Sequence, residues 1–230
     1  MSLWRIIRVL LTGVFVLACD AADQSVEHDD KIDLSRLPGL YSGTYPCSNC
    51  PGIDVRLWLR SDGGYFLRQN YLATEDVDDH LSYGTGRWFW SMDAGLLTLQ
   101  GRGPQRRFAY SDGGRLDLYP PPTLEHSLFV ETPQVVFTES FRMEGEYVAT
   151  RGSETFTECL TGIQFSLNDG GERQKMRRQH RLLSLPQLPA LTVIQAQISS
   201  SYDQTTLEPL AVERLLSMKP NTECKVSSRD

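Results

Sequence analysis

The sequence contains no apolar run long enough to span a membrane as a helix. The hydrophobic run near the N-terminus, VLLTGVFVLA, covers only residues 9–18, whereas a transmembrane helix needs about 20 apolar residues. Positive charge is also scarce, with 23 Lys and Arg against 29 Asp and Glu and a formal net charge of −6. No basic patch interleaved with aromatic residues is present, so the composition argues against nucleic acid as a partner.

Sequence motifs of common enzymes are missing as well. There is no Gly-x-Ser-x-Gly nucleophile motif. The four histidines, at positions 28, 80, 126 and 180, show no zinc-ligand spacing. We therefore expect a protein that is not an enzyme and that requires no cofactor.

The N-terminus has the pattern of an export signal. Arg5 and Arg8 precede the apolar run, which ends at the small residue Ala18, as in secretory signal peptides. Cys19 follows, and VLAC looks like the lipobox of bacterial lipoproteins, in which this cysteine becomes the acylated N-terminus. We expect a signal peptide over 1–18 and a lipid anchor, with palmitate, on Cys19. The alternative is an ordinary cleavable signal followed by a chance cysteine.

A polar segment follows the lipobox. Residues 19–36 are charged and nearly free of large apolar side chains, which is typical of a flexible tether. Several acyl chains anchor a protein stably without any transmembrane helix. Loss of Arg5 and Arg8 with the signal would take the net charge from −6 to −8.

Short alternating strands fill the region after the tether. DVRLWLR places Val55, Leu57 and Leu59 on one face, as in a strand with one buried side. Ser-Asp-Gly-Gly occurs at 61–64 and at 111–114, and Asn-Asp-Gly-Gly at 168–171. Asp-Gly between strands is a strong hairpin signal. We expect an antiparallel meander that closes into a small β-barrel over 37–120.

Three consecutive prolines end this region, and we expect a Pro-rich linker over 121–134, because proline cannot donate the amide hydrogen bond of a central strand. The segment 135–230 is again strand-like, with one stretch of helix formers, GERQKMRRQHRLLSL. Five strands around a single helix fit an OB-type barrel. The last apolar run, LEPLAVERLLSM, is compatible with strand or helix. The expected fold class is all-β with minor α, in two barrels.

Cysteine count favours a disulfide framework. Without Cys19, four cysteines remain, at positions 47, 50, 159 and 224, and an even number in an oxidising compartment is typical of disulfides. We favour pairing within each expected domain. Cys159 and Cys224 are 65 positions apart, and a bond over such a loop contributes about 4 kcal/mol in the loop-entropy model.

The Cys47-x-x-Cys50 pair leaves three interpretations open. Two thiolates at this spacing can bind Cu(I), although no cluster of methionines accompanies them. A redox enzyme needs such a pair at a helix N-terminus, and the flanking sequence favours strands. A local disulfide that staples the loop is the simplest interpretation, with copper binding or thiol sensing as the alternative.

Two blocks of sequence resemble the NlpE (CutF) lipoproteins. Residues 39–71, GLYSGTYPCSNCPGIDVRLWLRSDGGYFLRQNY, are similar to the N-terminal signature of that family, and residues 145–162, GEYVATRGSETFTECLTG, look like part of its C-terminal domain. The resemblance implies a lipocalin-like N-terminal barrel, an OB-fold C-terminal domain and a role in copper tolerance. It also implies activation of a Cpx-type sensor kinase and a C-terminal disulfide, here Cys159–Cys224, whose formation by a periplasmic disulfide oxidase reports on oxidation.

The resulting hypothesis is a non-catalytic envelope lipoprotein that senses faults in lipoprotein trafficking, disulfide formation or surface contact and that takes part in copper homeostasis. The alternative is a small barrel that carries Cu(I) or a small apolar ligand and has no signalling partner. The resemblance implies delivery to the outer membrane by the lipoprotein sorting machinery. Asp20, directly after the lipobox cysteine, makes the inner membrane the alternative.

Overall fold

The computed structural model describes residues 33–72, 80–111, 113–131, 137, 139–183, 188–198, 207–220 and 224. The expected signal peptide over 1–18, Cys19 and most of the expected tether over 19–36 lie outside these residues. The end of that tether, Leu34–Arg36, forms a short 3-10 helix (η1) capped by the Asp33 side chain, which accepts a hydrogen bond from the Ser35 amide. In the part of the chain that the structure describes, no helix is long and apolar enough to cross a membrane.

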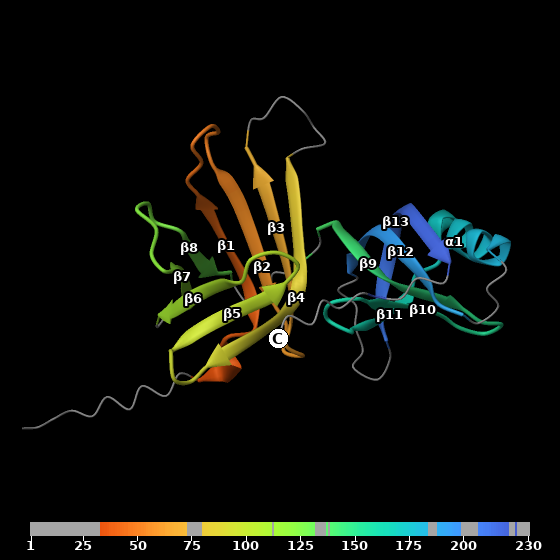
Figure 1. Cartoon of the computed structure of the whole chain (residues 1–230), viewed down its shortest axis with the longest axis horizontal. Coiled ribbons are helices and arrows are strands. Elements are labelled where there is room, and N and C mark those ends of the chain that lie inside the picture. The colour runs from red at the N-terminus through yellow and green to blue at the C-terminus, as the bar shows by residue number, and fades with distance from the viewer. Residues whose placement is uncertain are drawn as a thin grey trace, which may run out of the picture. The chain divides into compact units, whose positions relative to one another are not determined.

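The first barrel is a closed meander of eight antiparallel strands in chain order (Figure 1). Its strands are β1 (Gly39–Tyr45), β2 (Ile53–Leu59), β3 (Gly64–Tyr71), β4 (Leu81–Ser91), β5 (Leu96–Gly101), β6 (Arg106–Ser111), β7 (Arg115–Tyr119) and β8 (Ser127–Val130). Gly63 and Gly113, from the Ser-Asp-Gly-Gly segments at 61–64 and 111–114, lie between β2 and β3 and between β6 and β7 and have positive φ. This arrangement confirms the lipocalin-like barrel.

The first barrel extends beyond the expected boundary at residue 120. The expected linker over 121–134 contains β8, which pairs with β7 and also with β1, through Tyr41↔Val130 and Ser42↔Phe129. The prolines do end a strand, because β7 stops at Tyr119. Strand pairing resumes within the same segment, and without β8 both β1 and β7 would be left as unpaired edges.

The second barrel has five strands in the order β10-β11-β13-β12-β9. Its elements are β9 (Phe141–Ala149), β10 (Glu154–Glu158), β11 (Gln164–Leu167), α1 (Gly171–Leu182), β12 (Ala190–Ile198) and β13 (Glu208–Pro220). A helix between the third and fourth strands, with β11 parallel to β13, confirms the OB-type arrangement. The last apolar run is the strand β13. The third Asp-Gly-Gly segment leads into α1 and makes no hairpin.

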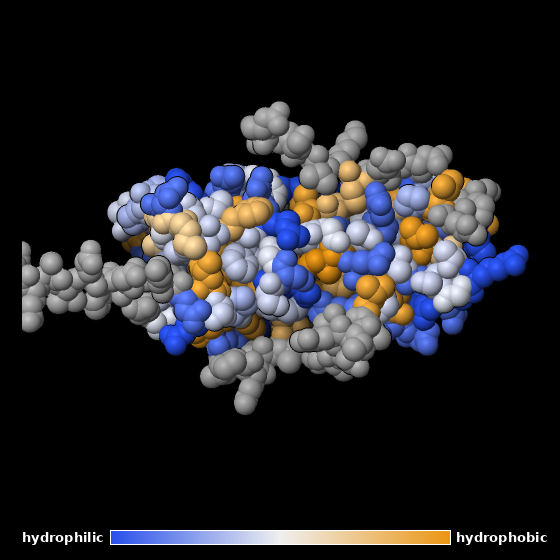
Figure 2. All heavy atoms as spheres, turned by 90° about the horizontal axis from the view of Figure 1, so that it is seen from below, coloured by the Kyte–Doolittle hydropathy of each residue, from blue (hydrophilic) through white to orange (hydrophobic). Residues whose placement is uncertain are grey.

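Each barrel has its own apolar core. Tyr41, Leu57, Leu97 and Phe108 fill the first barrel. A second cluster fills the other barrel around Phe141, Tyr147, Phe156, Phe165 and Ile194, and it also includes Leu40 and Phe66 from β1 and β3. Both barrels lie within one compact unit that begins at Asp33. On the face shown in Figure 2, apolar residues lie in separate groups between polar ones.

Helix α1 packs on the second barrel through a small apolar face and a buried charge. Met176 and His180, four positions apart, are its buried residues. Glu154 of β10 is almost fully buried and forms ion pairs with Arg173 and Arg177 of the helix. A buried carboxylate without a partner is costly, so two of the basic residues in this helix have a structural role.

Candidate functional site

Cys47 and Cys50 lie in the connection between β1 and β2 and are joined by a disulfide bond, with a Cα–Cα distance of 5.3 Å. Strand β2 begins at Ile53, directly after this loop, so the pair does not have the helix N-terminus that lowers the pKa of the reactive thiol in redox enzymes. Gly52 allows the loop to approach β1 closely, because a Cβ there would lie 2.8 Å from Cγ2 of Thr44. The disulfide therefore closes the loop between β1 and β2.

Few other metal ligands accompany this pair. Among the described residues, no group of three or more His, Cys, Asp or Glu side chains could hold a metal ion. Met143 and Met176 are buried in the core of the second barrel, and Met218 packs against the same core. The two sulfur atoms of the pair would be available to Cu(I) only after reduction of the disulfide.

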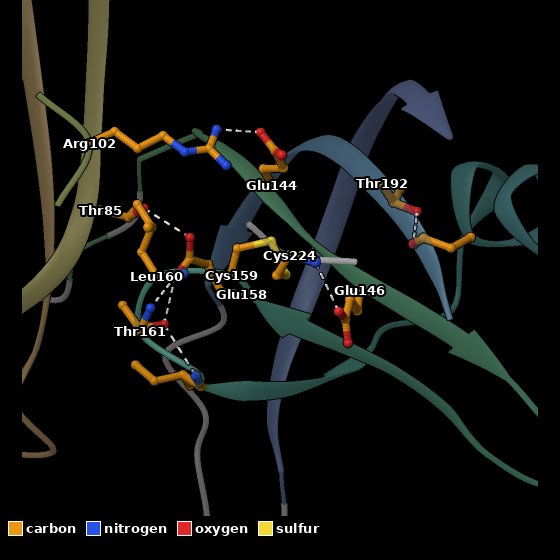
Figure 3. The surroundings of a disulfide bond; sticks show 12 residues. Thr85, Arg102, Glu144, Glu146, Glu158, Cys159, Leu160, Thr161, Thr192 and Cys224 are labelled. Carbon is orange, nitrogen blue, oxygen red and sulfur yellow. Dashed lines mark hydrogen bonds and ion pairs between the residues drawn. A yellow bond between two sulfur atoms is a disulfide. The ribbon is translucent and has the colours of Figure 1, made fainter. Parts of the chain in front are cut away.

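Cys159 and Cys224 form the second disulfide bond, with a Cα–Cα distance of 5.2 Å. Cys159 is the first residue after β10, is 6% exposed, and its amide donates to the Glu144 carbonyl of β9. Cys224 follows β13, and its amide donates to the Glu146 side chain of β9. Figure 3 shows that the bond fastens the chain after β13 to the β10–β11 turn.

Glu158, the residue before Cys159, is the centre of a buried hydrogen-bond network. Its Oε2 accepts from the Leu160 amide at 3.0 Å, the Thr161 amide at 2.7 Å and the Thr161 hydroxyl at 2.7 Å. Its Oε1 accepts from the Thr85 hydroxyl of β4 at 2.9 Å (Figure 3). The same carboxylate therefore fixes the turn that carries Cys159 and contacts the first barrel.

Further polar contacts surround this network. Arg87 of β4 donates to the Thr161 carbonyl at 2.8 Å. Arg102, just after β5, pairs with Glu144, and its hydrogen bond lowers the pKa of that carboxyl below the ordinary value. A cavity of about 400 Å³ lies beside these groups and is lined by both barrels.

A second polar contact joins the barrels through Arg60 at the end of β2. Its Nη1 lies 2.7 Å from Oε2 of Glu208 in β13, and both side chains are mostly buried. Burial raises the pKa of Glu208 although Arg60 acts in the opposite direction. Arg60 also contacts Asp62 and lies over the ring of Trp58.

The sequence pattern did not reveal the role of Glu158, although a signal was present. In β10, Glu154, Phe156 and Glu158 alternate with half-buried threonines and share the buried face. Glutamate at two of three buried positions is unusual, because such a carboxylate needs partners. Because alternate residues of a strand share a face, the position of Phe156 between them places both glutamates on the buried face.

Comparisons with known proteins agree with the two blocks of resembling sequence. Residues 41–119 match the family model of the NlpE N-terminal domain. The chain is 25% identical over 201 residues to lipoprotein NlpE of Escherichia coli, and the match covers 84% of this chain and 83% of that protein.

Two solved structures are also similar. The crystal structure of the Cpx pathway activator NlpE from Escherichia coli has 22% identity and a TM-score of 0.36, covering 82% of this chain and 98% of the other. A putative lipoprotein from Shewanella oneidensis has 26% identity and a TM-score of 0.31, covering 37% and 72%. Both TM-scores are too low for the structural similarity to support a conclusion beyond that of the sequence match. Residues 41–119 are similar to the NlpE N-terminal domain, and the chain as a whole is similar to lipoprotein NlpE over most of its length.

Proposed function

We propose that this chain is a non-catalytic envelope lipoprotein that reports on periplasmic oxidation to a Cpx-type sensor kinase and takes part in copper homeostasis. The observation that carries this proposal is the sequence match to lipoprotein NlpE of Escherichia coli, which extends over both barrels. The solved protein of that name is described as a Cpx pathway activator. We propose the same role, activation of a Cpx-type pathway, for this chain.

The lipid anchor would be Cys19, on the periplasmic face of the outer or inner membrane, after delivery by the lipoprotein sorting machinery. Replacing Cys19 with alanine should move the protein from the membrane to the soluble fraction, because each buried CH₂ of an acyl chain contributes about 0.8 kcal/mol to membrane binding. Fractionation of cells that express each form, followed by immunoblotting, measures this. Retention of Cys19→Ala in the membrane would contradict the anchor.

The sensing element would be the Cys159–Cys224 bond. When it forms, the two thiols lose two protons and two electrons to a disulfide oxidase, whose own disulfide is reduced to a dithiol. In the oxidised state the bond holds the β10–β11 turn, and the carboxylate of Glu158, the last residue of β10, contacts Thr85 of the first barrel. Loss of the bond would release the segment after β13 and loosen this turn.

Replacing Cys159 with alanine should therefore raise transcription from a Cpx-dependent promoter severalfold even in an oxidising periplasm. The test uses a strain that lacks its own activator and carries a reporter gene. Cys224→Ala should have the same effect, because either substitution removes the same bond. Reporter activity equal to wild type in both variants, at matched protein levels, would contradict the sensor function.

Cys47→Ala is the matched control, because it removes the other disulfide. We expect unchanged basal signalling from this variant but lower copper tolerance, since the thiolate pair would bind Cu(I) when reduced. The measurement is growth of the same strains in increasing copper. Equal copper tolerance of wild type and Cys47→Ala would contradict the role in copper homeostasis. The Cys47–Cys50 bond would then be only a structural disulfide of the loop.

A further inference from the structure

The wall of the first barrel has a lateral gap beside β4. Strand β4 pairs with β3 from Leu81 to Arg87, but it pairs with β5 only from Gly86 to Ser91. The two strands cross closely at the start of that shorter ladder, where a Cβ on Gly86 would lie 2.1 Å from the Gln100 carbonyl oxygen. Residues 81–85 have no partner on β5, and this part of β4 lies beside the second barrel, because Thr85 donates to Glu158.

A cavity of about 130 Å³ lies behind this gap, inside the first barrel. Its lining includes Tyr65, Leu67, Gln69, Gly84, Leu99 and Arg106. Leu67 and Leu99 are buried and give it an apolar wall. The other walls are polar, so the cavity combines hydrocarbon with hydrogen-bonding groups, as small-molecule sites do.

Arg106 is a positive charge in this cavity without a carboxylate partner among the described residues. Its Nη2 donates to the amide oxygen of Gln69 at 2.8 Å, and Gln69 is neutral. Arg102 at the mouth differs, because it pairs with Glu144. A guanidinium has five N–H donors and is suited to binding a carboxylate with two parallel hydrogen bonds.

Tyr65 supplies a hydroxyl at the same place. Its oxygen lies 2.4 Å from the position that a Cβ on Gly101 would take, at the end of β5. Burial raises the pKa of Tyr65 to about 12, although the Arg106 charge lowers it. The hydroxyl is therefore protonated at neutral pH and can donate a hydrogen bond.

We propose that this cavity binds a small organic carboxylate, with its oxygens on the Arg106 guanidinium and the Tyr65 hydroxyl and a short apolar tail against Leu67 and Leu99. The volume supports a small ligand, because a cavity of about 150 Å³ holds a molecule the size of benzene. A long acyl chain does not fit, since Leu57, Leu59, Phe108 and Leu116 fill the rest of the barrel. This site is independent of the proposed signalling function.

Titration calorimetry of the purified full-length protein with butyrate tests the proposal. We expect saturable 1:1 binding with a Kd of about 1 mM, as befits a ligand of few atoms. Arg106→Gln should weaken binding about tenfold or more, because it removes a charge-assisted hydrogen-bond pair. Arg107→Gln is the matched control, since Arg107 is the next residue on β6 but is exposed and lies over the ring of Tyr119.

A second variant fills the cavity without changing its charge. A Cβ on Gly84 would have only ordinary contacts, the nearest at 3.6 Å from Leu67, so Gly84→Val should fold and should also weaken butyrate binding. If Arg106→Gln does not fold, butyrate binding by Gly84→Val is the result that tests the proposal. The proposal is overturned if wild type shows no saturable binding, if Arg106→Gln and Arg107→Gln bind alike, or if inorganic phosphate binds as tightly as butyrate.

Discussion

Replacing Cys159 with alanine is expected to lower the free energy of unfolding of the second barrel by about 4 kcal/mol. The bond to Cys224 closes a loop of sequence separation 65, and cross-linking a loop of that length removes a large amount of conformational entropy from the unfolded chain. Small domains have a total stability of about 5–15 kcal/mol. The variant should therefore keep its fold only with a narrow margin.

The chain offers a direct way to measure this effect in one barrel. Tryptophans are present at positions 58, 88 and 90 in the first barrel, whereas residues 135–230 contain none. Trp58 packs against the core of the second barrel, so all forms compared carry Trp58→Phe. In urea, the fluorescence of Trp88 and Trp90 then follows the first barrel, and far-UV circular dichroism follows both. We expect the transition seen only by circular dichroism to move to lower urea in Cys159→Ala.

The other disulfide provides the matched control. Cys47 and Cys50 are separated by only three positions, so the same entropy model assigns less than about 2 kcal/mol to their bond. Cys47→Ala should shift the fluorescence transition slightly and leave the second barrel unchanged. Equal shifts in both variants would show that loop length does not determine the contribution of these bonds.

Local patterns in the sequence predicted most of the strands and both barrels. The alternation in DVRLWLR became β2, with Val55, Leu57 and Leu59 inside, and two Ser-Asp-Gly-Gly segments became turns. These features depend on neighbouring residues, because alternation and turn chemistry act over a few positions. The resemblance of residues 39–71 to the NlpE signature predicted the similarity to lipoprotein NlpE that the comparisons found.

Features that depend on distant parts of the chain were not predicted. Strand β8 lies within a segment that proline marks as a linker, and the residues of β1 that pair with it are 87 and 89 positions earlier. The Asn-Asp-Gly-Gly at 168–171 makes no hairpin, because the helix expected from the helix formers after it begins at Gly171. Glu158 was missed for the same reason, since its partner Thr85 belongs to the other barrel.

Replacing Glu158 with alanine is expected to lower the free energy of unfolding by about 3 kcal/mol or more. The substitution leaves the two buried donors of Thr161 and the half-buried Leu160 amide without their acceptor, and each unsatisfied buried group costs about 1–3 kcal/mol. It also opens space beside Cys159. Chemical denaturation measures the loss, and Glu213→Ala is the control, because Glu213 is exposed and accepts a side-chain hydrogen bond only from Ser140.

Thr85 allows the contribution of the contact between the barrels to be separated from that of the turn. Thr85→Val keeps the shape of the side chain and removes the hydroxyl that donates to Glu158 Oε1. A double-mutant cycle of Thr85→Val with Glu158→Ala should give a coupling energy of about 1.5–3 kcal/mol, the range for hydrogen bonds to charged groups. Additive effects would mean that this bond does not stabilise the contact between the barrels. A large coupling would mean that the residue next to Cys159 also stabilises the contact with the first barrel, so that release of the disulfide-bearing turn weakens that contact too.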